Sequence, residues 1–263
     1  MALGAAKWIG TARIKTPDGL TWLADPLDLK SAGVSLYHGS PGVVLFLNEL
    51  AGATGDTSFL DEACLGADYL GASLQREPEL DAGLYTGVAG IVFCLGQTAR
   101  ASGRGRYREI ALRGLKLLEE RARPAGAGVA WNESADIISG NAGIGLLLLY
   151  AHREMKAPGA LDLAVRAGRR LVELGQPATN GLKWPISPSV RQLYPNFSHG
   201  AAGAGFFLAR LYQETGERAF LDAALAAARY LDAVATKADG GFSVFHHEPG
   251  GEDLYYLSWC HGP

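Results

Sequence analysis

The chain has 263 residues, enough for one large domain or two small ones, and its 48% hydrophobic and 19% charged residues indicate a buried core and not a disordered chain. A formal net charge of −3 at pH 7, with no block of lysines or arginines, argues against a nucleic acid or an acidic membrane surface as partner. The N-terminus lacks the apolar core of a signal peptide, and no apolar run is long enough to span a bilayer. The three cysteines lack the spacing of a disulfide framework, which indicates reduced thiols. We therefore expect a cytoplasmic protein.

The first 35 residues form a lead-in. The stretch from Ala2 to Ile14 predicts a short helix, and Thr16-Pro17-Asp18-Gly19 predicts a turn, because proline fixes φ and glycine permits a positive φ. Residues 22–29 are expected to be irregular and to close over the first of the repeats that make up the rest of the chain.

These repeats share one element, x-Gly-x-x-Gly followed by an apolar run. Its copies are LYHGSPGVVLFL from Leu36, LYTGVAGIVFCL from Leu84, IISGNAGIGLLL from Ile137 and FSHGAAGAGFFL from Phe197, and WCHGP from Trp259 begins a fifth. They recur roughly every 50 to 60 residues, which is typical of repeat architectures. The copies resemble one another and no linker separates them, so a single domain over residues 1–263 is expected.

Each repeat divides into two helical halves. The first half is apolar on all sides, which predicts a buried helix, over residues 43–51, 91–99, 144–151 and 204–212. The second half is amphipathic, over residues 57–74, 106–123, 159–174 and 218–235. Alternating buried and exposed helices predict an all-α protein with two concentric layers, an α/α toroid, with an open α-solenoid as the alternative.

The loops that enter the buried helices should converge on one rim. Two of these loops are long, residues 124–135 and 177–196, and long loops on a shared rim commonly carry function. The residue before the first glycine of each repeat also lies on this rim; in chain order it is His38, Thr86, Ser139, His199 and His261.

Among these rim residues, His199 is the strongest acid–base candidate, because it lies at the start of a buried helix after a long loop. His38 has no acidic or thiol residue beside it in sequence and is expected to cap its helix or to pack against the rim. Asp136, four residues before Gly140, is either a helix N-cap or a second chemical group on the rim.

The densest chemical cluster is Trp259-Cys260-His261. Thiolate and imidazole are the usual zinc ligands, but two adjacent residues supply at most two of the three or four that zinc needs. The pair His246-His247 is expected to be solvated. Cys64 and Cys94 fall on apolar helical stretches and are expected to lie in the core.

The ordered series LYHGSPG, LYTGVAG, SADIISGNAG, NFSHGAAG and SWCHGP resembles the lanthionine synthetase C-like (LanC-like) proteins over nearly the whole chain. The resemblance implies a seven-repeat α/α toroid with a zinc ion at the rim. It also implies a cyclase whose substrate is a dehydrated precursor peptide. A peptide cysteine bound to zinc loses its proton and adds to dehydroalanine or dehydrobutyrine, which closes a thioether ring.

Carried over residue by residue, the resemblance makes Cys260 the first zinc cysteine and His199 an acid–base group. Asp136 is implied to be a second acid–base or orienting group, and Trp259 to shape the pocket beside the metal. His261 occupies a position where relatives carry tyrosine or histidine, so it is a possible ligand only.

The chain departs from the family pattern in three ways. It has four complete repeats where seven are expected, and it lacks the later Cys-His-Gly motif that supplies the remaining zinc ligands. It also lacks the arginine that often precedes Trp-Cys. We therefore expect a chain truncated at the first zinc-cysteine motif, with an incomplete zinc site and with self-association left open.

Three alternatives remain. One is a LanC-like enzyme that adds glutathione or another thiol to dehydrated side chains, and another is a non-catalytic module that binds peptides or proteins. A glycoside hydrolase on the same fold is less favoured, because it needs paired carboxylates and only Asp136 is well placed.

Overall fold

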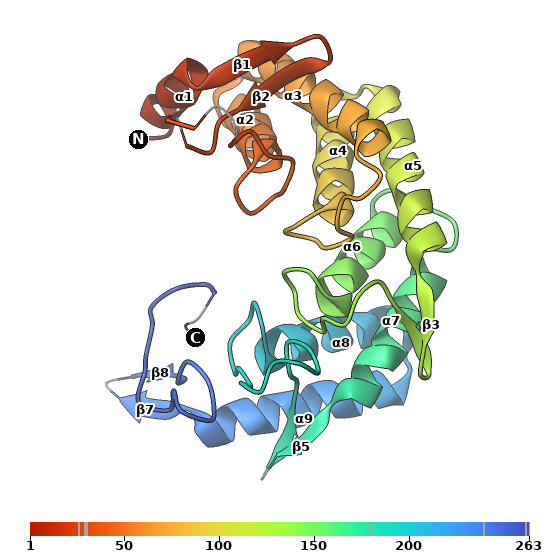
Figure 1. The fold of residues 1–263 in the computed structure, drawn as a ribbon, viewed down its shortest axis with the longest axis vertical. Coiled ribbons are helices and arrows are strands. Elements are labelled where there is room, and N and C mark those ends of the chain that lie inside the picture. Colours follow the sequence, from red (N-terminus) through yellow and green to blue (C-terminus); the bar gives the residue numbers. More distant parts are fainter. Residues whose placement is uncertain (26, 29–30, 179, 239, 261, 263) are drawn as a thin grey trace. The chain divides into compact units, whose positions relative to one another are not determined.

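The computed structural model describes residues 1–25, 27–28, 31–178, 180–238, 240–260 and 262. Its contacts group the chain into two compact units, residues 1–120 and 121–263, which are described separately (Figure 1). The expectation of a single domain stays a prediction. In the described part of the chain, no helix combines the length and the apolar character that a membrane crossing requires.

Unit 1 begins with a helix and a hairpin and continues with two helical pairs. The lead-in consists of α1 (Ala2–Thr11), β1 (Arg13–Thr16) and β2 (Gly19–Trp22). The helical pairs are α2 (Ser40–Thr54) with α3 (Thr57–Arg76), and α4 (Val88–Ser102) with α5 (Gly105–Arg121). The predicted helix from Ala2 to Ile14 is therefore too long, because residues 13–16 pair with residues 19–22 across the predicted turn.

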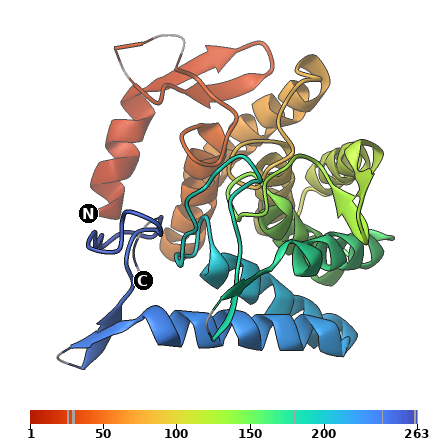
Figure 2. The ribbon, with the colours of Figure 1, turned by 60° about the horizontal axis from the view of Figure 1, so that its bottom comes forward.

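Unit 2 begins with a short hairpin and contains two further helical pairs, each followed by another hairpin. The pairs are α6 (Asn141–Arg153) with α7 (Ala160–Leu174), and α8 (Ala201–Thr215) with α9 (Arg218–Val234). The hairpins are β3 (Arg123–Ala125) with β4 (Gly128–Ala130), β5 (Gln176–Ala178) with β6 (Gly181–Lys183), and β7 (Thr236–Ala238) with β8 (Gly241–Ser243). Figures 1 and 2 show α8 and α9 side by side, with the β7–β8 hairpin beyond the end of α9.

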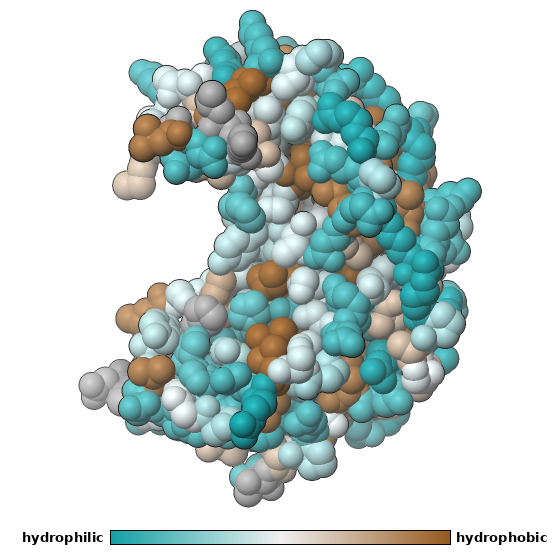
Figure 3. Space-filling view, in the orientation of Figure 1, coloured by the Kyte–Doolittle hydropathy of each residue, from teal (hydrophilic) through white to brown (hydrophobic). Residues whose placement is uncertain are grey.

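The eight paired helices form the two predicted layers within each unit. α2, α4, α6 and α8 carry most of the fully buried apolar side chains, and α2 packs on α4 as α6 packs on α8. The partner helices bury one face only; in α5, for example, Gly114 lies against Val92 of α4. The surface over α5 is mostly hydrophilic (Figure 3). All eight helices lie where the sequence predicts them, to within a few residues at each end.

The hairpins are the main difference from the sequence-based expectation, which treats residues 124–135 and 177–196 as loops. The strands β3 to β8 have only three residues each, too few for an alternating pattern to be visible in the sequence. The available signal in the sequence was the dipeptides Asn180-Gly181 and Asp239-Gly240, because Asn-Gly and Asp-Gly are typical of hairpin turns. Each hairpin sets the exit from one helical pair and the entry to the following rim loop.

The first glycine of each repeat is the N-cap of a buried helix and contacts the preceding loop. A Cβ added at Gly87 would lie 1.7 Å from the carbonyl oxygen of Asp81, and this oxygen accepts a 2.7 Å hydrogen bond from Val88 N–H, the first residue of α4. At Gly39, Gly140, Gly200 and Gly262, an added Cβ would likewise lie against the carbonyl oxygen of the residue six positions earlier. The repeated glycine therefore lets the rim loop satisfy a helix N–H group through its own backbone.

We expect Gly87→Ala to destabilise unit 1 by about 3 kcal/mol or more, because backbone must move to admit the methyl group. Gly52→Ala is the matched control in the same unit, since a Cβ there has no neighbour within 4 Å. Replacing a glycine inside a helix should stabilise the protein by about 0.5–1 kcal/mol. Urea unfolding followed by circular dichroism measures both; equal midpoints for the two variants would contradict the proposed role of the glycine.

Candidate active site

Three rim loops of unit 2 are connected by backbone hydrogen bonds. Ala135 N–H donates to the carbonyl of Ile186 (2.8 Å), and Ile137 N–H donates to the carbonyl of Ser198 (3.0 Å). The loop before α8 is joined in turn to the C-terminal segment, because Leu193 and Glu248 exchange two backbone hydrogen bonds of 2.8 and 2.9 Å. The expected convergence of loops from different repeats is therefore confirmed within unit 2.

The long loop before α8 is held to the helices by a buried tryptophan. Trp184 is 1% exposed, and its indole N–H donates a 2.8 Å hydrogen bond to the carbonyl of Leu171 near the end of α7. An indole buried with its N–H satisfied fixes a loop firmly. This contact positions the segment that leads to His199.

Asp136 uses its two carboxylate oxygens differently. Oδ1 accepts hydrogen bonds of 2.9 Å from the backbone N–H groups of Ser139 and Gly140, which closes the turn before α6. Oδ2 accepts from Nδ1 of His199, at 2.8 Å. Both interpretations of Asp136 therefore apply, one to each oxygen. Oδ1 caps the start of α6, and Oδ2 is available to the chemistry of the rim through His199.

His199 is held at the start of α8 by its backbone and by its ring. Its N–H donates to Oδ1 of Asn196 (2.9 Å), the residue that occupies the place of Asp136 in the next repeat. An ionised carboxylate can only accept, so Nδ1 carries the proton, and neutral His199 has its lone pair on Nε2. The His199 side chain is 24% exposed and that of Asp136 is 2% exposed, so a substrate could reach the imidazole but not the carboxylate.

The C-terminal segment brings Trp259 and Cys260 to the same place. Ser198, next to His199, donates a 2.5 Å hydrogen bond from its hydroxyl group to the carbonyl of Cys260. The rings of Phe197 and Trp259 are 5.8 Å apart, and Trp259 is 43% exposed. The four candidate residues Asp136, His199, Trp259 and Cys260 thus lie on one connected set of loops, whereas His261 lies outside the described residues.

Comparisons with known proteins identify the family of the chain. The family model described as lanthionine synthetase C-like protein matches residues 30–263. The chain belongs to this family. None of the curated proteins compared with this LanC-like chain matches its sequence.

Solved structures show what the LanC-like fold resembles. Nisin cyclase superposes with a TM-score of 0.69 at 18% identity, and the match covers 99% of this chain and 66% of nisin cyclase. An α-1,6-mannanase, GH76A of Salegentibacter sp. HEL1_6, superposes with a TM-score of 0.60 at 16% identity, covering 90% of this chain and 70% of the mannanase. A family 76 mannosidase of Bacteroides thetaiotaomicron superposes with a TM-score of 0.55 at 13% identity, and the match covers 89% of this chain and 72% of the mannosidase. These likenesses confirm the predicted all-α, α/α-toroid fold class.

The donor set does not by itself fit a complete zinc site. Across the described residues, no group of three or more histidine, cysteine, aspartate or glutamate side chains could hold a metal ion. Cys260 supplies one thiol at the rim, and a zinc site needs three or four ligands. Among the candidate residues, the hydrogen-bonded pair for proton transfer is Asp136 and His199.

A pair of histidines adjoins His199 and differs from its expected environment. His246 and His247 are half-buried, and their Nδ1 atoms are 2.6 Å apart, so the prediction of a solvated pair is wrong. Both rings pack on Tyr194, at centroid distances of 5.4 and 5.6 Å, and Tyr194 lies 6.0 Å from the ring of His199. The sequence around His246 and His247 gave no signal of this contact, because Tyr194 lies more than 50 residues earlier in the chain.

The other candidate residues have structural roles. Cys64 and Cys94 are buried as predicted, at 1% and 0% exposure, and burial raises the pKa of the Cys94 thiol well above its usual value. In unit 1, Nδ1 of His38 lies 3.2 Å from the hydroxyl oxygen of Ser35 in its own loop.

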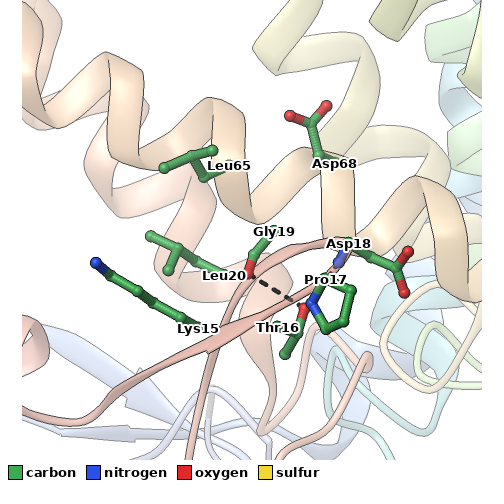
Figure 4. A pocket seen from close by; sticks show the side chains of 8 residues that line it. All are labelled: Lys15, Thr16, Pro17, Asp18, Gly19, Leu20, Leu65 and Asp68. Atoms are coloured by element: carbon green, nitrogen blue, oxygen red, sulfur yellow. Dashed lines mark hydrogen bonds between the residues drawn. The ribbon is translucent and has the colours of Figure 1, made fainter.

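A cavity of about 410 Å³ in unit 1 lies between the β1–β2 turn and α3 (Figure 4). It is lined by Lys15, Thr16, Pro17, Asp18, Gly19, Leu20, Leu65 and Asp68. Its two carboxylates already pair with arginines, Asp18 with Arg76 and Asp68 with Arg106. This cavity contains none of the candidate residues.

Proposed function

We propose that the intact protein is a LanC-like cyclase that adds a cysteine thiolate of a peptide to dehydroalanine or dehydrobutyrine, forming a lanthionine-type thioether ring. The observation that carries the proposal is the hydrogen bond between Asp136 and His199 on the loops that also hold Cys260. Family membership and the likeness to nisin cyclase support a peptide substrate.

The reaction requires two proton transfers that balance. The thiol loses a proton, sulfur forms a bond to Cβ of the dehydroamino acid, and the π electrons of the alkene move to form an enolate. Cα of the enolate then gains a proton. Nε2 of His199 can accept the first proton and deliver the second, so the imidazole ends in its starting state.

Asp136 supports this cycle without touching substrate. Its carboxylate accepts from Nδ1 and thereby leaves the lone pair on Nε2, and its negative charge stabilises the imidazolium between the two transfers. Two backbone N–H groups hold the other oxygen, so the carboxylate cannot rotate away from the ring. Asp136 is thus proposed as a positioning residue.

An apolar wall lies beside this pair. Trp259 and Phe206 are 43% and 46% exposed, and the ring of Phe197 contacts both, at 5.8 and 5.5 Å. Exposed aromatic rings next to a polar group are typical of sites that bind apolar side chains. We assign this wall to residues of the peptide that flank the reacting pair.

The reaction is tested with a synthetic peptide that carries one cysteine and one dehydroalanine. Cyclisation leaves the peptide mass unchanged and removes the thiol, so mass spectrometry after alkylation with N-ethylmaleimide distinguishes substrate from product. We expect thiol loss to be much faster with the protein than without it. Unaccelerated thiol loss, with the peptide bound in a fluorescence polarisation assay, would instead indicate a non-catalytic module.

A second probe separates the cyclase from an enzyme that adds free thiols. A dehydroalanine peptide without cysteine is incubated with glutathione, and addition increases its mass by one glutathione. Faster turnover of this peptide than of the cysteine peptide would replace the cyclase proposal with thiol addition to dehydrated side chains.

Zinc remains a proposed cofactor, which would supply thiolate formation when bound, and Cys260 is the residue that would hold it. At least one further ligand has to come from outside the described residues. Zinc that the wild type binds, measured by elemental analysis, should fall clearly in Cys260→Ser. Cys64→Ala, which removes a buried thiol, is the control that should retain zinc. Unchanged zinc in Cys260→Ser would remove Cys260 from the ligand set.

A further inference from the structure

The β1–β2 hairpin of unit 1 has one covered strand and one open strand. β2 packs on α2 and α3, and all its residues after the first are buried. The residues of β1 are alternately exposed and half-buried, and Figure 1 shows β1 on the side of β2 that faces away from α2. In the described part of the chain this sheet has two strands, so it ends at β1.

The register of the hairpin determines which backbone groups of β1 are unused. Leu23 N–H donates to the carbonyl of Ala12, and pairs with hydrogen bonds alternate with pairs without them along an antiparallel ladder. Arg13 and Lys15 therefore belong to pairs without hydrogen bonds, and their N–H and C=O groups point away from β2. Among the residues that the structure describes, none is hydrogen-bonded to these groups. β1 thus offers two donors and two acceptors to a further strand.

Two other hairpins are closed at the position that β1 leaves open. β3 and β5 carry Pro124 and Pro177 one residue before the pair that closes the turn, where β1 carries Lys15. Proline has no N–H, so at this position it removes the outward donor of an edge strand. β7 carries Lys237 there, and its ammonium group pairs with Asp232. Lys15 combines an outward N–H with an ammonium group that pairs with no carboxylate of the described residues.

The surface beside Lys15 has the chemistry to accept peptide side chains. Lys15 pairs with Leu20, so the two side chains lie on one face of the hairpin, and both line the cavity of about 410 Å³ together with Leu65 of α3 (Figure 4). Leu65 is 46% exposed. Because the two carboxylates of the cavity pair with arginines, Lys15 supplies its unbalanced charge. This surface suits a ligand that carries a carboxylate and an apolar side chain.

A second copy of this chain is a poor occupant of the open strand. Antiparallel pairing of two β1 strands through these outward groups would bring Arg13 and Lys15 of one chain against the same two cations of the other. Like charges directly opposite each other destabilise a sheet. The charge of β1 therefore disfavours self-pairing and favours an acidic partner.

We propose that β1 is a docking strand for an extended peptide segment, which adds to the outward backbone groups of Arg13 and Lys15 and places an acidic side chain against Lys15. The peptide side chain two residues along lies on the same face, and it enters the cavity beside Leu65 as an apolar group. The docking strand lies in unit 1 and contains none of the candidate residues of the acid–base site. Its binding of peptide is therefore independent of the proposed cyclase reaction.

The test is the binding of a fluorescein-labelled peptide of repeated Thr-Glu-Thr-Leu to the full chain, measured by fluorescence polarisation. In this peptide glutamate and leucine alternate on one face of the strand. We expect saturable binding, and weaker binding of a Thr-Lys-Thr-Leu peptide. In hydrogen-exchange NMR the amide protons of Arg13 and Lys15 should become protected by the glutamate peptide. No saturable binding, or no protection of these two amides, would overturn the proposal.

Lys15→Pro introduces into β1 the residue that closes β3 and β5. It removes the outward N–H and leaves the hydrogen bonds to β2 in place, so we expect the hairpin to persist and the affinity for the glutamate peptide to fall about tenfold or more. Lys237→Pro makes the same change in β7 and should leave the affinity unchanged. Equal affinities of Lys15→Pro and wild type would refute docking on β1. A loss confined to Lys237→Pro would move the peptide to β7 and refute it as well.

Lys15→Glu tests the charge and decides the question if Lys15→Pro does not fold. It keeps the backbone N–H, and we expect it to reverse the preference from the glutamate peptide to the lysine peptide. Lys116→Glu, an exposed change on α5, is the control that should keep the wild-type preference. An unchanged preference in Lys15→Glu would contradict the proposal.

Two further outcomes separate this proposal from its neighbours. A wild-type dimer in analytical ultracentrifugation that becomes a monomer in Lys15→Pro would assign the open strand to a second copy and refute a peptide as its occupant. Cyclisation of the cysteine–dehydroalanine peptide without binding of the glutamate peptide would refute the docking strand and leave the proposed function intact. Binding without cyclisation would do the reverse.

Discussion

His199→Asn is expected to lower the rate of thioether formation by about 10²–10⁴-fold, the usual contribution of a positioned acid–base group. Asparagine can still accept a hydrogen bond but cannot exchange a proton near neutral pH. The His199 backbone remains bonded to Asn196 whatever the side chain, so the start of α8 should persist. The measurement is the initial rate of thiol loss in the synthetic peptide, with peptide binding measured in parallel.

His38→Asn is the matched control, because His38 also precedes the first glycine of a repeat but its Nδ1 faces the hydroxyl group of Ser35 and not a carboxylate. It should keep wild-type activity. Zinc content should be the same in His199→Asn as in wild type. A loss of zinc in His199→Asn would make His199 a ligand, and full activity would exclude it from the proton transfers.

Asp136→Asn is expected to lower the rate by a similar factor, about 10²–10⁴-fold, with little loss of stability. An amide oxygen can retain both backbone hydrogen bonds that close the turn, as Asn196 does for the N–H of His199 in the next repeat. The amide nitrogen would then face Nδ1 of His199 as a donor. The imidazole would have to move its proton to Nε2, where it blocks acceptance of the thiol proton.

The double variant Asp136→Asn with His199→Asn separates a shared role from two independent ones. Groups that act as one unit are strongly non-additive, so the double variant should be about as slow as His199→Asn alone. Multiplication of the two single losses would show that Asp136 acts apart from the imidazole. Urea unfolding of the single variants checks that the loops before α6 and α8 are intact.

Most of the fold could be predicted from the sequence because its signals are local. The repeated glycines mark the helix starts, and apolar or amphipathic character separates the buried helices from the exposed ones. The hairpins were missed because three-residue strands have no visible period. The lead-in helix was predicted too long, since the pairing of residues 13–16 with 19–22 depends on a partner strand.

The site was predicted less completely, because it depends on contacts between repeats. Asp136 and His199 were chosen separately, and nothing in their spacing required the 2.8 Å hydrogen bond between them. His246 and His247 were expected to be solvated because they lie near a glycine-rich loop. Their partial burial comes in part from Tyr194, which lies more than 50 residues earlier in the chain. Contacts of this kind have no local signature.

The glycine contact with the preceding carbonyl has a consequence for engineering. Main-chain atoms make this contact, and the residue before the glycine is histidine, threonine or serine. Each described side chain at this position has its own hydrogen-bond partner in a rim loop: Ser35 for His38, Asp81 for Thr86, and Asp136 for both Ser139 and His199. A redesign of the rim would therefore have to replace each residue together with its loop partner, and it could leave the helices beneath unchanged.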